Sequence, residues 1–475
     1  MKTKQIDDFW LYKFRYQITY TILFASYLAI IFYSIFIAPN GLTNAEVESA
    51  TFSANLDFSQ IFSAQILNFP FRILQKISIG IFGLSNFSIK LPAILISFAT
   101  IFAIIRLAHI WFERGTATMA SIIAITSSQF FFIAQNGTPD ILYIFYPILL
   151  ILAGGLFMES RKITPLIVGF FVLALSFYTP LTIYIVLAML LTILAHPRLR
   201  LMITREIKKA RIFGTFALFL LLAPLAVAIF FEPAMLKTIF GIPDSLNLFE
   251  NFNLLISNLF SFSSSNSGGV IAPIINPAAA ILIAIGLYFT FSAKYTAKSY
   301  LVNIWSLILL AVCVINPNLT TILFTPILLL TITGLQSLIQ TWYMLFPKNP
   351  YARVFGLFPI VFFVVSLLLT SLNHFQQSYV HSPEVAQNFS QDLRLLLENS
   401  DSNRVLMVSK EERDFYAILE NQNAAKLASN FENEQIIVSK KFFENLKLPK
   451  EYRISRIITS SASKNSDRFY ILHKI

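Results

Sequence analysis

The chain has 475 residues, of which 56% are hydrophobic and 13% are charged, and its formal net charge is +11. Soluble globular proteins carry about 25% charged residues, so this composition excludes a soluble enzyme. The 48 Phe and 18 Tyr residues exclude a disordered chain, and the single Cys excludes a disulfide framework. The sequence therefore predicts a polytopic membrane protein.

Charged residues are concentrated near the C-terminus. Residues 380–475 contain 27 charged residues in 96, whereas residues 1–379 contain 34 in 379. Short alternating and amphipathic segments in the C-terminal part predict a small α/β domain. We therefore expect a transmembrane domain over residues 1–379 and a soluble α/β domain over residues 380–475. Membrane topology explains the positive charge of the first part, so no nucleic-acid partner is expected.

Eleven apolar segments are candidates for membrane-spanning helices, each of which needs about 20 residues to cross the hydrocarbon core. The first has no signal-peptide cleavage pattern after it and is interpreted as an uncleaved anchor. The candidates are residues 17–37, 91–111, 117–135, 139–158, 163–179, 181–196, 212–231, 274–293, 300–315, 319–340 and 354–373.

The loops between these segments differ in basic charge. If the N-terminus is cytoplasmic, 18 of the 22 Lys and Arg residues before position 380 fall on the cytoplasmic side. Short cytoplasmic loops are enriched in Lys and Arg, so this orientation is expected. Eleven spans then place residues 374–475 outside the cytoplasmic membrane.

The first outer loop, residues 38–90, has a helical pattern of its own. Thr43 and Glu46 have the spacing of a capping box, and apolar residues then recur at helical intervals. Arg72 and Lys76 lie one turn apart on the second amphipathic stretch. Helices of this kind lie in the membrane interface, where an enzyme could meet a lipid-linked substrate. Glu48 and Asp57 of the same loop are interpreted as solvated acids.

Four short segments carry a resemblance to a known family. They are Gly41–Glu46 (GLTNAE), Asn68–Phe71 (NFPF), Phe82–Pro92 (FGLSNFSIKLP) and Ala134–Asp140 (AQNGTPD). In order and spacing they resemble the first-loop motifs of the glycosyltransferase family 39 and aminoarabinose-transferase-like group. The resemblance implies the GT-C fold, an all-α polytopic membrane protein of about eleven spans with a small extracytoplasmic C-terminal domain.

The resemblance also implies a function. Members of this group transfer a sugar from a polyprenyl-phosphate carrier to an extracytoplasmic acceptor with inversion, without a nucleotide cofactor. A carboxylate takes the proton of the acceptor hydroxyl, and cations stabilise the leaving phosphate. The resemblance assigns catalysis to Glu46 and Asp140 and phosphate binding to Arg72, Lys76 and Lys90. The His and Cys residues show no metal-ligand spacing, and a carboxylate-bound divalent metal is left open.

The sequence also departs from the family pattern. The first acid of the family's Asp-Glu pair falls on Ala45, an Arg falls on Lys90, and the Arg before the second acid falls on Gln135. These changes leave two other hypotheses open. One is a catalytically inactive homologue that binds a polyprenyl lipid or a membrane partner. The other is a lipid flippase or transporter.

Overall fold

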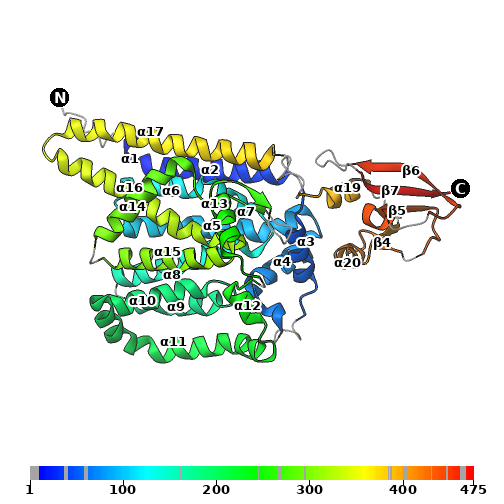
Figure 1. Ribbon diagram of the computed structural model, residues 1–475, viewed down its shortest axis with the longest axis horizontal. Coiled ribbons are helices and arrows are strands. Elements are labelled where there is room, and N and C mark those ends of the chain that lie inside the picture. Colours follow the sequence, from blue (N-terminus) through cyan, green and yellow to red (C-terminus); the bar gives the residue numbers. More distant parts are fainter. Residues whose placement is uncertain are drawn as a thin grey trace.

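The structure is a computed structural model with two parts, a helical bundle and a small domain that projects from one end of it (Figure 1). The first described residues, 10–13, lie toward the end of the bundle away from this small domain (Figure 1). The structure describes residues 10–36, 41–57, 63–160, 162–243, 245–264, 270–293, 296–382, 385, 388–399, 405–428, 430–444, 448–459 and 467–475.

The helical bundle is built from helices of very different lengths. Its elements are α1 (Trp10–Lys13), α2 (Arg15–Phe36), α5 (Asn86–Trp111), α6 (Arg114–Ile125), α7 (Ser128–Gln135), η4 (Pro139–Ile141), α8 (Leu142–Ser160), α9 (Ile163–Ser176), α10 (Ile183–Ala195), α11 (Pro197–Phe231), α12 (Met235–Phe240), α13 (Leu248–Phe260), η5 (Pro277–Ala279), α14 (Ala280–Ser292), α15 (Ala297–Ile315), η6 (Pro317–Leu323), α16 (Phe324–Leu345), α17 (Pro350–His374) and η7 (Phe375–Val380). A short hairpin pairs β1 (Ser263–Ser264) with β2 (Val270–Ile271).

The number of spans differs from the predicted eleven. Among the described residues, 7 helices are long and apolar enough to cross a membrane, or up to 9 if two bent helix pairs each count as one span. The other two predicted spans coincide with α9 and α14, which have only 14 and 13 residues. A helix needs about 20 residues to cross the hydrocarbon core, so neither of these two helices is long enough to cross a bilayer of ordinary thickness by itself.

The first loop forms two helices, α3 (Asn44–Ala54) and α4 (Phe69–Phe82), with the short turn η3 (Ala64–Ile66) between them. The predicted capping box is present, because Thr43 and Glu46 bond each other's backbone N–H groups. On α4, Phe71, Gln75 and Ile79 are buried, whereas Ile77 is 51% exposed. The face of α4 that carries Ile77 therefore points outward, and the inward face carries a glutamine between two apolar residues.

The C-terminal domain contains a five-stranded mixed sheet of order β4-β3-β5-β7-β6. Strand β3 is parallel to β4 and β5, and β7 is antiparallel to β5 and β6. The strands are β3 (Val405–Met407), β4 (Lys426–Leu427), β5 (Gln435–Ser439), β6 (Tyr452–Thr459) and β7 (Asp467–Lys474), and the helices are α19 (Asp392–Asn399), α20 (Arg413–Asn421) and α21 (Lys440–Glu444). The α/β pattern expected from the sequence is thus confirmed.

The small domain is attached directly to the first loop. Leu42 and Ser390 form an antiparallel bridge, and the Gln422 side chain accepts from Leu84 N at 2.8 Å and donates to Ile79 O at 3.2 Å. Apolar residues of α3 and α4 share one buried cluster with α19 and α20. The segment 382–384 (SPE) has the sequence of a helix start and predicts a helix from Ser382. This prediction is wrong over residues 388–391, since Ser390 is extended and α19 begins at Asp392. Pro383 and Glu384 lie outside the described residues.

Candidate active site

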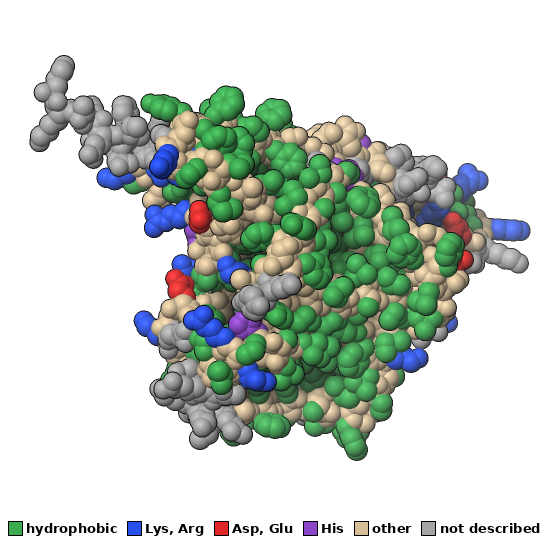
Figure 2. Space-filling model, turned by 60° about the vertical axis from the view of Figure 1, so that its left-hand side comes forward, with side chains coloured by type: hydrophobic (Ala, Val, Ile, Leu, Met, Phe, Trp, Pro, Cys, Tyr) green, Lys and Arg blue, Asp and Glu red, His purple; other side chains and the backbone are tan. Residues whose placement is uncertain are grey.

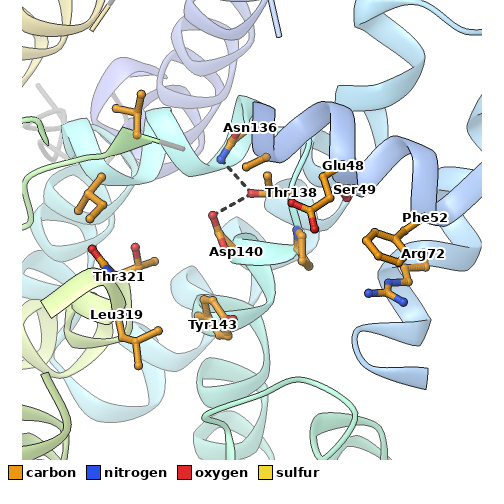
Figure 3. Close-up of a pocket in the computed structure, with 15 residues that line it drawn as sticks. Glu48, Ser49, Phe52, Arg72, Asn136, Thr138, Asp140, Tyr143, Leu319 and Thr321 are labelled. Atoms are coloured by element: carbon orange, nitrogen blue, oxygen red, sulfur yellow. Dashed lines mark hydrogen bonds between the residues drawn. The ribbon is translucent and has the colours of Figure 1, made fainter. Parts of the chain in front are cut away.

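A cavity of about 340 Å³ lies where the first loop meets the end of the bundle. Helix α3 forms one wall, and the segment that leads into α8 forms another (Figure 3). Strand β2 and the 3-10 helix η6 supply the rest of the lining. The polar lining side chains are those of Glu48, Ser49, Arg72, Asn136, Thr138, Asp140, Tyr143, Asn318 and Thr321.

Asp140 reaches the cavity from the turn before α8. The Thr138 hydroxyl donates to Asp140 Oδ2 at 2.8 Å, and the Asn136 amide donates to the same hydroxyl at 2.9 Å (Figure 3). These two hydrogen bonds fix the position of the carboxylate. Asn136 is only 5% exposed, and its Oδ1 has no hydrogen-bond partner among the described residues. The cavity wall thus offers a buried acceptor that a bound molecule could satisfy.

Glu48 and Arg72 form the opposite part of the lining. Glu48 lies on the exposed face of α3, which agrees with its interpretation as a solvated acid, and it also faces this cavity together with Asp140 (Figure 3). The Arg72 guanidinium packs over the Phe52 ring at 5.1 Å and donates to Gln65 O at 2.7 Å. Burial lowers the pKa of Arg72, and the nearby Glu48 carboxylate acts in the opposite direction.

Glu46 is not part of the lining. Its side chain is fully buried, and its carboxylate accepts from Thr43 N at 2.8 Å and from Gly137 N at 2.7 Å. Lys90 Nζ lies 3.5 Å from Glu46 Oε1, and both side chains are at most 3% exposed. The structure therefore places Glu46 and Lys90 in a buried ion pair beneath the site. The geometry supports neither the predicted catalytic role of Glu46 nor the predicted phosphate contact of Lys90.

Lys76 is also directed away from the cavity. Its ammonium donates to the backbone carbonyl of Leu56, which lies just after α3. Of the three predicted phosphate-binding residues, only Arg72 lines the cavity. Of the two predicted catalytic acids, only Asp140 does.

Gln75 connects the walls of the site, and sequence reasoning missed it. Its amide donates to Ile89 O at 3.0 Å and to Gly137 O at 2.9 Å, and its carbonyl accepts from the hydroxyls of Ser49 and Ser53. All of its hydrogen-bonding capacity is satisfied in a fully buried position. The signal was present in the sequence, since Gln75 falls four residues from both Phe71 and Ile79 on one helical face.

The backbone of Gly137 is therefore bound by two buried side chains. The Gly137 N–H donates to Glu46, and the Gly137 carbonyl accepts from Gln75. A side chain at this position would collide with Ile89, because a Cβ atom would lie 2.7 Å from Ile89 Cγ2. This close packing fixes the segment that carries Thr138 and Asp140. Glu46 and Gln75 thus position the site without entering it.

One departure from the family pattern, Ala45, is visible in the lining. Ala45 lines the cavity at the position of the family's first acid, and η6 contributes Asn318, Leu319 and Thr321 but no cation. Among the described residues, no group of three His, Cys, Asp or Glu side chains could hold a metal ion. The cavity thus combines two carboxylates with one guanidinium, which suits proton abstraction next to an anionic group.

Comparisons with known proteins bear on the family and the fold of this chain. Residues 70–227 match the protein family described as dolichyl-phosphate-mannose-protein mannosyltransferase. No curated protein sequence is similar enough to this chain to count as a relative. The predicted resemblance to glycosyltransferase family 39 is confirmed over the matched residues, which include Arg72, Lys90 and Asp140.

Solved structures show the same fold. ArnT from Cupriavidus metallidurans in the apo state has a TM-score of 0.55 at 11% identity, over 95% of this chain and 97% of ArnT. ArnT bound to undecaprenyl phosphate gives a TM-score of 0.56 at 10% identity and the same coverage. The apo oligosaccharyltransferase of Archaeoglobus fulgidus gives 0.52 at 11% identity, over 88% of this chain and 65% of that protein. The predicted GT-C fold is confirmed.

Proposed function

We propose that this chain, a membrane protein of the GT-C glycosyltransferase fold, transfers a sugar from a polyprenyl-phosphate carrier to an acceptor hydroxyl on the extracytoplasmic side. The observation that carries the proposal is the cavity in which Asp140, Glu48 and Arg72 meet at the end of the bundle. The undecaprenyl phosphate bound to ArnT, which has the same fold, supports a lipid-linked donor.

Arg72 is the residue that we assign to the carrier phosphate. Its guanidinium is always charged and can donate to two phosphate oxygens at once. Stacking on Phe52 and the bond to Gln65 O hold it at the cavity wall before any ligand enters. Because it is pre-positioned, little conformational entropy is lost when it stabilises the charge of the leaving phosphate.

Asp140 is the residue that we assign as general base. Among the described residues it has no ion-pair partner, whereas Glu48 interacts electrostatically with Arg72. A base next to a cation binds a proton less readily, so the unpaired carboxylate is the better acceptor. The Thr138 hydroxyl, at 2.8 Å, holds it toward the cavity. Attack from the side opposite the phosphate would invert the anomeric centre.

The test compares the replacement of an acid that lines the cavity with the replacement of an acid outside it. We expect Asp140→Asn to lower the release of undecaprenyl phosphate from an undecaprenyl-phosphate-linked sugar by about 10²–10⁴-fold, the range for loss of a general base. Asp57→Asn is the control, since Asp57 is exposed at the end of α3 and does not line the cavity. A wild-type rate for Asp140→Asn would remove this residue from the mechanism.

The proposal requires the cavity to face outward. Many Lys and Arg side chains of the bundle gather at the end away from the small domain (Figures 1 and 2), which supports a cytoplasmic N-terminus and an extracytoplasmic C-terminal domain in the cytoplasmic membrane. A single cysteine at the exposed position Asn430, with Cys313 replaced by Ser, should react with an impermeant maleimide in intact cells. Labelling only after lysis would place the cavity on the wrong side for this reaction.

Two features of the cavity lining favour a second function. Ala45 lines the cavity where the family has an acid, and η6 brings no cation to it. These features fit an inactive homologue that still binds polyprenyl phosphate through Arg72. If wild type binds undecaprenyl phosphate but releases none from the linked sugar, this second function replaces the first.

A further inference from the structure

A second cavity, of about 750 Å³, lies between helices α5, α8, α9, α10 and α15, away from the candidate active site. Its wall on α8 begins at Leu150, seven residues beyond Tyr143, the residue of α8 that lines the first cavity. At 1.5 Å per residue the two cavities are separated by roughly 10 Å along this helix. The second cavity is therefore a separate site, and binding there does not depend on the proposed transfer reaction.

The interior of this cavity is apolar, and glycines form part of its wall. Leu, Ile, Val, Met and Phe side chains form most of its wall, with Gly154, Gly155 and Gly169 among them. A Cβ atom at Gly154 would have no heavy atom within 4 Å, so this glycine borders empty space. An apolar space of this size inside a membrane-spanning bundle suits hydrocarbon chains.

The rim of the cavity carries a cation that is held in place. Lys298, in the first turn of α15, donates to the Trp111 carbonyl, and its ammonium lies 5.5 Å from the Trp111 and Phe112 rings. An ammonium group has three donors, so two remain for a ligand. Glu159 on the same rim lies 3.4 Å from Arg106, which leaves its charge compensated.

The surroundings of the rim are also basic. Figure 2 shows Lys and Arg side chains gathered at this end of the molecule, whereas the side of the bundle in the same view is hydrophobic. Lys298 and Glu159 line the cavity, and two further cations lie near its rim. Arg106 pairs with Glu159, and both Arg106 and Arg114 interact electrostatically with His109, which also lines the cavity.

We propose that this cavity binds one anionic diacyl phospholipid, with its acyl chains between α8, α9 and α10 and its phosphate at Lys298. Basic pockets between transmembrane helices on the cytoplasmic side bind anionic headgroups, and the predicted topology places this end there. The apolar space alone would accept any lipid. The fixed ammonium and the excess of cations select a negative headgroup.

The test measures bound lipid on the full-length protein by native mass spectrometry after delipidation in mild detergent. We expect one phosphatidylglycerol per chain, retained about fivefold better than phosphatidylcholine with the same acyl chains, since one basic residue contributes about 1 kcal/mol toward an anionic lipid. Lys298→Gln should lower phosphatidylglycerol retention to the phosphatidylcholine level. Gly154→Leu should lower the retention of both lipids, because the new side chain fills the cavity.

The control is Gly80→Leu on α4. An added Cβ at Gly80 also has no heavy atom within 4 Å, but Gly80 does not line this cavity. Equal retention of the two lipids by wild type would overturn the proposal, and so would wild-type retention in Lys298→Gln. Displacement of phosphatidylglycerol by equimolar undecaprenyl phosphate would assign the cavity to the polyprenyl carrier and overturn it as well. The thermal unfolding temperature of each variant shows whether the variant is folded. If Gly154→Leu is not folded, Lys298→Gln still tests the proposal.

Discussion

The two faces of helix α3 carry carboxylates only two positions apart, yet these have opposite roles. Glu46 is fully buried and compensated by Lys90 and two backbone N–H groups. Glu48 is exposed and lines the cavity with Asp140. Residues two apart on a helix differ by about 200° in direction, so neighbouring acids face opposite sides. A motif that retains an acid therefore does not show which acid reaches the substrate.

The buried face of α3 also organises the exposed one. Glu46 at the third helical position turns back to cap the helix, which brings its other oxygen to Gly137 N. Gln75 binds Ser49 and Ser53 of the same helix and Gly137 O. Both contacts hold the segment that carries Asp140. The site thus depends on the buried polar residues Glu46 and Gln75. Variants of the buried face of α3 should therefore affect stability, whereas variants of its exposed face should affect binding and transfer.

The largest effect on stability is expected at Glu46. Glu46→Gln leaves Lys90 charged and uncompensated in a buried position, which should lower the free energy of unfolding by about 3–5 kcal/mol. Glu48→Gln on the exposed face should change it by no more than about 0.5 kcal/mol. Equilibrium denaturation in mixed micelles measures both.

A compensating change sharpens the same test. Adding Lys90→Met to Glu46→Gln removes the uncompensated charge, so part of the lost stability should return. If Glu46→Gln is as stable as Glu48→Gln, the buried ion pair has no structural role and Glu46 regains its place as a candidate base.

The next largest effect is expected at Gln75. Gln75→Leu keeps a similar volume but leaves the Ile89 and Gly137 carbonyls without the amide donor, at a cost of about 1–3 kcal/mol for each unsatisfied buried group. Thermal unfolding in detergent should show a lower Tm. Ile77→Leu on the exposed face of α4 is the matched control and should leave Tm unchanged; a variant Gln75→Leu with the wild-type Tm would show that water replaces the amide.

A smaller effect is expected at Arg72, which packs on Phe52 of the exposed face. Arg72→Gln removes a charge-assisted contact worth about 1.5–3 kcal/mol, so binding of undecaprenyl phosphate should weaken by about 10- to 100-fold. Lys76→Gln is the control, because Lys76 binds the Leu56 carbonyl and does not line the cavity. Equal loss in both variants would indicate a general surface-charge effect.

The smallest effect on stability is expected at Ala45. This residue lies in the first turn of α3 and lines the cavity, so an acid there interacts favourably with the helix dipole, by about 0.3–1 kcal/mol. Ala45→Asp should therefore fold normally and raise the rate of sugar transfer, or create it. A stable Ala45→Asp variant without any gain in transfer would show that the missing acid is not what limits this protein.

Much of the fold follows from local patterns. The capping box at Thr43 and Glu46 was predicted correctly, because it depends on residues three positions apart. In the small domain, the sequence of residues 452–459 predicts a strand, and these residues form β6. Strand β4 was missed because its two residues have no periodicity of their own and pair only with β3.

The candidate site was only half predicted, for a physical reason. Asp140 and Arg72 were identified because their motifs or spacing are local. The position of Glu48 in the cavity was not predicted. A helical pattern shows that a residue is exposed, but it does not show whether the residue faces bulk solvent or a cavity whose other wall comes from a distant segment. Lys90 was assigned to phosphate because the sequence does not show that Gly137 and Glu46 lie beside it.

By itself the sequence determined that the chain enters a membrane, that its basic residues gather at one end, and that a small α/β domain follows the bundle. Hydropathy, charge asymmetry and helical periodicity are properties of neighbouring residues and need no tertiary contact. Only the tertiary structure decided which carboxylate faces the cavity, because that depends on contacts between α3, Gln75 of α4 and the segment before α8. Those contacts join residues up to 91 positions apart, a separation that no local pattern encodes.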